Sequence, residues 1–141
     1  MRLVAHINKL LQDDVYEIPA TVFKNDFLSA LETIAKYLHE NLNLGFVQIG
    51  KLLNRSDKTI WVTYQHSIKK MSHRFYPAKA QHYIPVSAFS NRTFSTLESL
   101  VMFLRETYGL SYDEIAGMLN RSYTTVVTVS NRATKKKGEM K

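Results

Sequence analysis

The chain has no cysteine among its 141 residues, which excludes a disulfide framework, a thiolate metal site and a cysteine nucleophile. It also has no uninterrupted apolar run approaching the ~20 residues that a membrane-spanning helix needs. No P-loop, G-x-G-x-x-G sequence or nucleophile elbow is present. We therefore expect a soluble, cytoplasmic protein that is not an enzyme, carries no cofactor and does not contact a membrane.

Metal-binding spacing is absent as well. None of the histidines forms an H-x-x-x-H or H-E-x-x-H pattern with another; they are His6, His39, His66, His73 and His82. The acidic residues are scattered, and most of them lie where a helix is expected to begin. We expect no metal site, and in particular no nuclease centre.

What the chain does contain is an internal repeat. Residues 18–70 align with residues 84–136 at a constant offset of 66 without a gap, and about a third of the aligned positions are identical. The run Leu-Asn-Arg-Ser at 53–56, for example, returns at 119–122. Two copies of one unit of about 50 residues predict two small domains with similar folds. Units of this size are near the lower limit for independent folding, so the copies can depend on each other for stability.

Three further segments complete the predicted organisation. Residues 1–17 have apolar side chains at helical spacing and predict an N-terminal helix, which packs either on the first domain or on a second subunit in a homodimer. Residues 71–83 have no clear period and are interpreted as a linker, with a short helix as the alternative. Residues 137–141 form a basic tail that we expect to be disordered. The predicted fold class is all-α.

Each copy shows three helical patterns. The first helix begins at a capping box, Ser29–Glu32 in one copy and Ser95–Glu98 in the other, and runs to about residue 41 or 107. Each copy opens with Ile-Pro, which favours an extended conformation because proline disfavours a helix at the residue before it.

The second and third helices are expected to be joined by a tight turn. In the second copy, Gly109 can end the first helix in a left-handed conformation, and the capping box Ser111–Glu114 opens the next. Asn120 and Arg121 form the turn, and Ser122 caps a third helix that runs through residue 136. In the first copy the corresponding helices span 46–53 and 57–70. The small residues Gly50 and Ala116 occupy the same place in the second helix, where they allow a close helix crossing.

The second copy is similar to region 4 of bacterial sigma factors and to the helix-turn-helix of response regulators. Those typically have the pattern G-x-S-x-x-E-I-A-x-x-L, a short turn, then S-x-x-T-V and a basic end. The matching residues here are Gly109, Ser111, Glu114, Ile115, Ala116, Leu119, Ser122, Thr125, Val126, Arg132, Ala133 and Lys135. The first copy departs from the pattern, with Gly45 at the capping serine and Gly50 in place of alanine. The resemblance implies two tandem helix-turn-helix domains that bind double-stranded DNA.

Helix geometry then selects candidate contacts to the bases. If Ile60 and Val126 face the core, the opposite face of each third helix can enter the major groove. The residues on those faces are Lys58, Trp61, Val62, Gln65, His66, Thr124, Val127, Thr128, Asn131 and Arg132. Gln65 and Asn131 share one offset, and each amide can pair with adenine. Solvent-facing polarity is the plainer interpretation of both amides, and a domain interface is the alternative for Trp61.

Positive charge supports the same interpretation. The net charge is +7 and the isoelectric point is about 9.6, and basic residues gather late in each copy, where a phosphate footprint is expected. The candidate phosphate contacts are Arg55, Thr59, Lys69, Lys70, Arg121, Thr125, Lys135, Lys136 and Lys137.

Several functions fit these features. The leading hypothesis is a sequence-specific transcriptional regulator associated with the nucleoid, reading two different half-sites rather than a palindrome, or reading with one domain and clamping with the other. An architectural DNA-coating protein is the second hypothesis. The third is an adaptor whose helix-turn-helix units dock on transcription machinery, using side chains such as Trp61 and Val127. The DNA-binding part of a recombinase is a fourth, although the chain lacks room for a catalytic domain.

Overall fold

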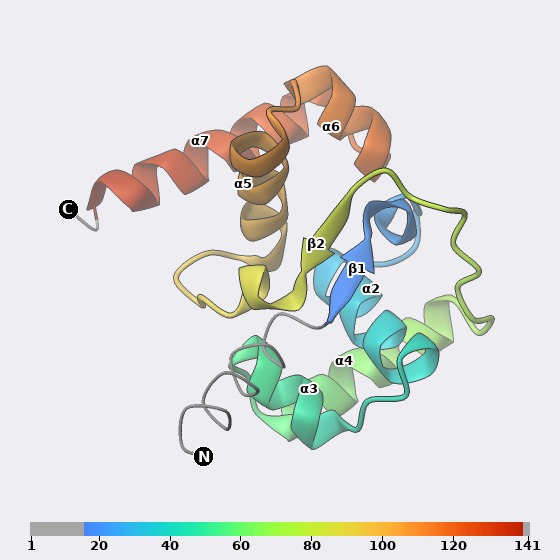
Figure 1. Ribbon diagram of the computed structural model, residues 1–141. Coiled ribbons are helices and arrows are strands. Elements are labelled where there is room, and N and C mark those ends of the chain that lie inside the picture. The colour runs from blue at the N-terminus through green and yellow to red at the C-terminus, as the bar shows by residue number, and fades with distance from the viewer. Residues whose placement is uncertain (1–15, 140–141) are drawn as a thin grey trace, which may run out of the picture.

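The computed structural model describes residues 16–139, which are predominantly helical with one small sheet (Figure 1). The first copy contains β1 (Glu17–Pro19), the 3-10 helix η1 (Ala20–Phe23), α2 (Ala30–Lys36), the π-helical turn η2 (Tyr37–Asn41), α3 (Phe46–Leu53) and α4 (Asp57–Lys70). The second copy contains β2 (Tyr83–Pro85), the 3-10 helix η3 (Val86–Phe89), α5 (Thr96–Tyr108), α6 (Tyr112–Leu119) and α7 (Tyr123–Glu139). Apart from η2, equivalent elements begin 66 residues apart.

The capping boxes predicted from the sequence are all present. In α5, for example, the Glu98 amide donates to Ser95 Oγ at 3.1 Å, and the Ser95 amide donates to a Glu98 carboxylate oxygen at 2.9 Å. The same reciprocal pairs open α2 and α6. Each box satisfies two amide groups that the helix itself leaves without partners, which fixes where the helix begins.

Residues in the left-handed conformation end α3, α5 and α6. Gly109 closes α5 with φ 65°, as predicted, and Asn54 and Asn120 close α3 and α6 with φ 57° and 51°. Asparagine tolerates this region better than most residues with a side chain. The predicted bounds 46–53 and 57–70 agree with α3 and α4.

The first helix of the first copy differs from the expectation of one regular helix to residue 41. It is α-helical only to Lys36 and continues as η2, where the Leu42 amide donates to the Tyr37 carbonyl at 3.3 Å. Lys36 is fully buried, and its ammonium lies 2.7 Å from Glu40 Oε1 one turn later. Glu40 in turn accepts a hydrogen bond of 2.7 Å from the Tyr64 hydroxyl of α4, so a polar cluster ties η2 to the third helix. This charge-bearing cluster has no counterpart in the second copy, where Met102 replaces the lysine and α5 remains regular.

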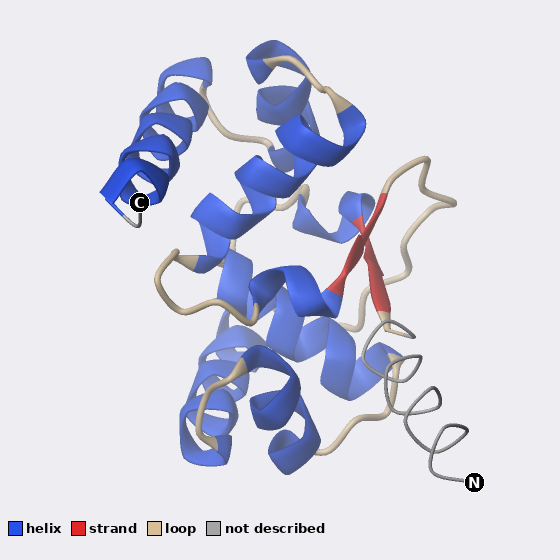
Figure 2. Ribbon diagram, turned by 60° about the vertical axis from the view of Figure 1, so that its left-hand side comes forward, coloured by secondary structure: helices blue, strands red, loops and turns tan. Residues whose placement is uncertain are grey.

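The all-α expectation needs one correction. The two Ile-Pro segments are extended, as predicted, but they also pair with each other as an antiparallel β1-β2 sheet, with Ile18 opposite Ile84. Figure 2 shows the two strands between the helices of the two copies. The pairing joins segments 66 residues apart, and a local sequence pattern cannot indicate a partner so distant in the chain.

Two segments outside the repeat, the linker and the C-terminal tail, both pack against the rest of the protein. The linker has no helix between residues 71 and 82, but Met71, Phe75 and Ala80 are buried, so it packs on the core as an ordered connection. The expected disorder of the tail is wrong for residues 137–139, which continue α7. The ammonium of Lys137 pairs with the Glu106 carboxylate of α5, which holds this last turn against the protein. The predicted N-terminal helix and its dimer contact fall almost entirely on residues 1–15, outside the described residues.

A single buried cluster of apolar side chains includes residues from both copies. At its centre Ile18 and Ile84 are fully buried, and the rings of Phe23 and Phe89 lie 6.3 Å apart between centroids. Helix α2 also contacts α5. The α3-α4 pair and the α6-α7 pair consequently lie at opposite ends of the molecule, with the shared core and the sheet between them (Figure 1).

Candidate nucleic-acid interface

The turn between the second and third helices is tight, above all in the first copy. The Arg55 amide donates to the Gly50 carbonyl at 2.8 Å, and a Cβ placed on Gly50 would lie 2.5 Å from the Arg55 carbonyl oxygen. In the second copy the Arg121 amide donates to the Ala116 carbonyl at 3.0 Å, and the turn accommodates the alanine methyl group. The expected close crossing at Gly50 and Ala116 is therefore present, and in the first copy it requires glycine.

A serine caps each third helix at the end of this turn. Ser56 Oγ accepts from the Thr59 amide at 3.1 Å and donates to the Thr59 hydroxyl at 2.8 Å. Ser122 and Thr125 repeat both contacts at the same distances. Both threonines are exposed, and each hydroxyl, having accepted the serine proton, can still donate its own. Thr59 and Thr125 thus present a hydroxyl donor and the start of a helix to solvent, as a phosphate contact requires.

The inward faces of the third helices agree with the predicted core positions. Ile60 and Ser67 are buried in α4, and Val126, Val129 and Ala133 are buried in α7. The rest of each helix faces away from the core. Among the proposed base contacts, the exposed ones are Lys58, Trp61, Val62, His66, Thr124, Thr128, Asn131 and Arg132.

Gln65 and Val127 are the two exceptions, because both are half-buried where the helical spacing predicted full exposure. The equivalence of Gln65 and Asn131 is therefore incomplete: the Asn131 side chain is exposed, whereas that of Gln65 is partly covered. The α7 helix retains the more accessible polar face.

The structure gives both turn arginines hydrogen-bond partners within the chain. Arg55 donates to the Leu53 carbonyl at 2.9 Å and, in the other copy, to the Phe89 carbonyl at 3.4 Å and the Thr96 hydroxyl at 3.5 Å. Burial, together with nearby Arg92, lowers the pKa of its guanidinium from the usual value. These contacts hold the arginine against the second copy, so it has a structural role beside the phosphate contact expected from the sequence.

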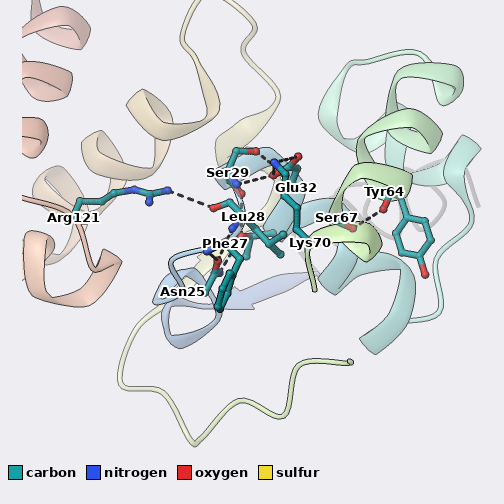
Figure 3. A network of polar contacts seen from close by, with 10 residues as sticks. Asn25, Phe27, Leu28, Ser29, Glu32, Tyr64, Ser67, Lys70 and Arg121 are labelled. Atoms are coloured by element: carbon teal, nitrogen blue, oxygen red, sulfur yellow. Dashed lines mark hydrogen bonds and ion pairs between the residues drawn. The ribbon is translucent and has the colours of Figure 1, made fainter. Parts of the chain in front are cut away.

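Arg121 also reaches the other copy, but at an acceptor that is not the counterpart of Phe89. Its guanidinium crosses from the second copy to the Leu28 carbonyl of the first at 3.5 Å, as Figure 3 shows. The sequence could not reveal this contact, because an arginine in the turn between two helices has the same sequence context whether it faces solvent or a neighbouring copy.

Three of the closing lysines also have intrachain partners. Lys70 lies 2.9 Å from the Glu32 carboxylate (Figure 3), and its counterpart Lys136 lies 2.6 Å from Glu98. Lys137 pairs with Glu106. These pairs tie the end of each third helix to the first helix of the same copy. Among the described residues, no carboxylate lies within salt-bridge distance of the exposed Lys69 and Lys135, so this equivalent pair of candidate phosphate contacts has no ion-pair partner there.

The sequence did not predict a basic depression on the surface of the first copy. The charged residues that line this depression, beside the turn of the first copy, are Lys51 of α3, Arg55, Arg92 from the second copy and one acidic residue, Asp57. The equivalent positions of Lys51 and Arg92 hold Gly117 and Asp26, and Asp26 accepts a hydrogen bond from Asn120. The first turn is therefore clearly more positive than the second. The opposite charges at aligned positions 26 and 92 were a signal in the sequence, but their place beside the turns depends on contact between the copies.

Two negative findings concern the described residues. Residues 16–139 contain no group of three or more histidine, aspartate or glutamate side chains placed to hold a metal ion. In the same part of the chain, no helix combines the length and apolar character needed to cross a membrane.

Comparison of the chain with known protein families, curated proteins and solved structures finds no match.

Proposed function

We propose that the chain binds double-stranded DNA in a sequence-specific manner. In this proposal it is a transcriptional regulator with two tandem helix-turn-helix units. The observation that carries the proposal is the repeated arrangement of a short helix, a tight turn and a capped third helix whose outward face is exposed and polar or basic. This arrangement occurs at equivalent positions of both copies. A helix presented in this way fits the major groove of duplex DNA.

The chemistry of α7 supports base recognition. The Asn131 amide can donate to and accept from adenine at once, Arg132 can donate two hydrogen bonds to guanine, and the Thr128 methyl group can contact that of thymine. All three side chains are exposed. Thr125 at the start of the helix and Lys135 near its end would contact phosphates, which position the helix without reading sequence.

The face of α4 is chemically different. It carries Lys58 and His66 beside the exposed apolar side chains of Trp61 and Val62. The basic depression around Lys51 and Arg92 adds positive charge next to this helix. We infer that the two units contact DNA differently, with α7 contributing more hydrogen-bonded base recognition and α4 more apolar contact and backbone attraction.

A protein adaptor is the second candidate, and the exposed apolar side chains near the first turn favour it. Trp61 is 50% exposed and Val47 of α3 is 57% exposed. A tryptophan with this exposure is a common anchor in protein interfaces.

Selection of bound sequences from a random duplex pool at ~50 mM salt tests the proposal, since phosphate-based binding is strong at low ionic strength. We expect an enriched motif with the wild-type chain, loss of preference at one base pair with Asn131→Ala, and no change with the control Gln81→Ala, an exposed amide outside both third helices. Binding without an enriched motif would favour the architectural protein. Absence of binding would contradict a DNA function and favour the adaptor.

A further inference from the structure

The contacts between the two copies are reciprocal, which defines the symmetry that relates them. In the sheet, Ile18 pairs with Ile84, its own counterpart, while Glu17 pairs with Pro85 and Pro19 pairs with Tyr83. Exchanging each residue for its counterpart 66 positions away converts one of these outer pairs into the other. The sheet is thus centred on a local two-fold axis that passes between the two isoleucines.

Backbone hydrogen bonds beside the sheet obey the same exchange. The Ala20 amide donates to the His82 carbonyl at 2.9 Å, and the Val86 amide donates to the Tyr16 carbonyl at 3.0 Å. These two bonds are counterparts with the roles of the copies exchanged. Two units related by a translation along the chain would make head-to-tail contacts without such a return partner.

Side chains and helices extend the symmetry to the helix-turn-helix units. The rings of Phe23 and Phe89, which are counterparts, contact each other across the axis. Arg55 reaches η3 of the second copy, and Arg121 reaches the Leu28 carbonyl of the first. Helix α3 contacts η3, and α6 contacts η1. The turns preceding α4 and α7 are therefore positioned by equivalent helix contacts on opposite sides of one axis, and each turn arginine reaches the other copy at its own acceptor.

We propose that this single chain recognises an inverted pair of half-sites, with the pseudo-two-fold axis of the protein lying on a local two-fold axis of the duplex. The proposal rests on the DNA-binding function proposed above and specifies the orientation of its target. A two-fold axis perpendicular to DNA exchanges the strands and reverses their direction, so helices related by that axis meet half-sites of opposite orientation. Because the outward faces of α4 and α7 differ, the half-sites are inverted in orientation but unlike in base sequence.

A hybrid chain makes the orientation directly visible. The substitutions Lys58→Thr, Trp61→Val, Val62→Thr, Gln65→Asn and His66→Arg give α4 the outward residues of α7, and none of the replaced residues is buried. We expect duplexes selected by the hybrid to contain a palindrome, with one half-site repeated in inverted orientation. A direct repeat, or a lone half-site without a second, would overturn the proposal while leaving DNA recognition intact. Failure of the wild-type chain to enrich any motif would contradict the proposed function itself.

Cleavage mapping provides a second measurement that keeps the wild-type outward residues. The chain has no cysteine, so Asp57→Cys and Tyr123→Cys each create a single attachment point for a DNA-cleaving iron chelate. These exposed counterparts begin α4 and α7 and are not among the proposed DNA contacts. On the wild-type site, we expect the cuts from one position to match those from the other after the two strands are exchanged. Patterns that match on the same strand would overturn the proposal. A chelate on His73→Cys, in the connecting segment, measures background cleavage.

Discussion

Ile18 and Ile84 occupy the same position in the two copies of the repeat and face each other at the centre of the antiparallel sheet. Both are fully buried. When a residue pairs with its own counterpart, a two-fold axis passes between the two residues. The two copies therefore form an intramolecular pseudo-dimer. Its stability depends on the turns and on the contacts between copies, whereas the proposed DNA binding would depend on the outward faces of the third helices.

Gly50→Ala is expected to destabilise the fold by about 1–3 kcal/mol, the usual effect of forcing extra atoms into a packed site. The added Cβ would lie 2.5 Å from the Arg55 carbonyl, which is backbone and cannot rotate away. Gly117→Ala is the matched control, since that helical glycine has open space on the side where a Cβ would extend; it should stabilise by roughly 0.5–1 kcal/mol. Urea unfolding measures both. Equal effects of the same sign would contradict the tight turn.

Arg55→Ala should lower the free energy of unfolding, because its guanidinium donates to the Phe89 carbonyl across the two copies. Hydrogen bonds from charged groups typically contribute about 1.5–3 kcal/mol. Lys58→Ala, in an exposed position on α4, should leave the unfolding free energy almost unchanged and weaken DNA binding. Thermal unfolding and binding assays on both variants separate the two roles. An Arg55→Ala protein with wild-type stability would show that the contact between copies is not structural.

Acid should destabilise the protein through Glu32 and Glu98. Burial by itself raises the pKa of the Glu32 carboxyl, but hydrogen bonds from Ser29 and Lys70 outweigh it, and the net pKa lies below the ordinary value of 4.5. The pKa of Glu98 is lowered in the same way, by Lys136 and Ser95 against the effect of burial.

A carboxyl whose pKa is lower in the folded state stabilises the fold above its unfolded pKa and loses that contribution as pH falls through the folded value. We therefore expect the free energy of unfolding, measured from about pH 6 down to pH 3, to decrease once the pH is below the ordinary carboxyl pKa. The double variant Glu32→Gln and Glu98→Gln should be less stable at neutral pH and show a shallower pH dependence. An unchanged slope would mean that these two carboxyls do not control acid stability.

Variants of two neighbouring lysines at the end of α7 should distinguish DNA binding from stabilisation of the fold. Lys135 has no carboxylate partner among the described residues, so Lys135→Ala should weaken all duplexes about equally and reduce the salt slope by about one unit. Lys136 pairs with Glu98 at 2.6 Å, so Lys136→Ala should act first on thermal stability. Identical behaviour of the two variants would contradict this division.

Base recognition is expected to depend on Asn131 on the same helix. Asn131→Ala should cost about 1–3 kcal/mol on the preferred site and relax the preference at one base pair. Binding titrations on specific and random duplexes, compared with Lys135→Ala, measure the difference. If both variants lose affinity equally on both duplexes, α7 does not read sequence and the architectural protein becomes the better hypothesis.

The sequence by itself determined the local structure of the repeat. Serine and glutamate three residues apart fixed the start of helices such as α5, and Gly109 marked the end of that helix, because these signals act through backbone groups only a few residues away. The repeat also located both turns, and the assumption that Ile60 and Val126 face the core agrees with their burial. The exposed candidates on α7, including Asn131, followed from the helical period.

Only the tertiary structure decided how the copies meet. The pairing of Ile18 with Ile84 joins residues far apart in the chain. So do the contacts by which Arg55 and Arg121 link the copies. Such contacts depend on the shape and burial of both copies together, and no periodicity within one copy encodes them. For the same reason, the two-fold relation between α4 and α7, and with it the expected orientation of the half-sites, became visible only when the two units were seen packed against each other.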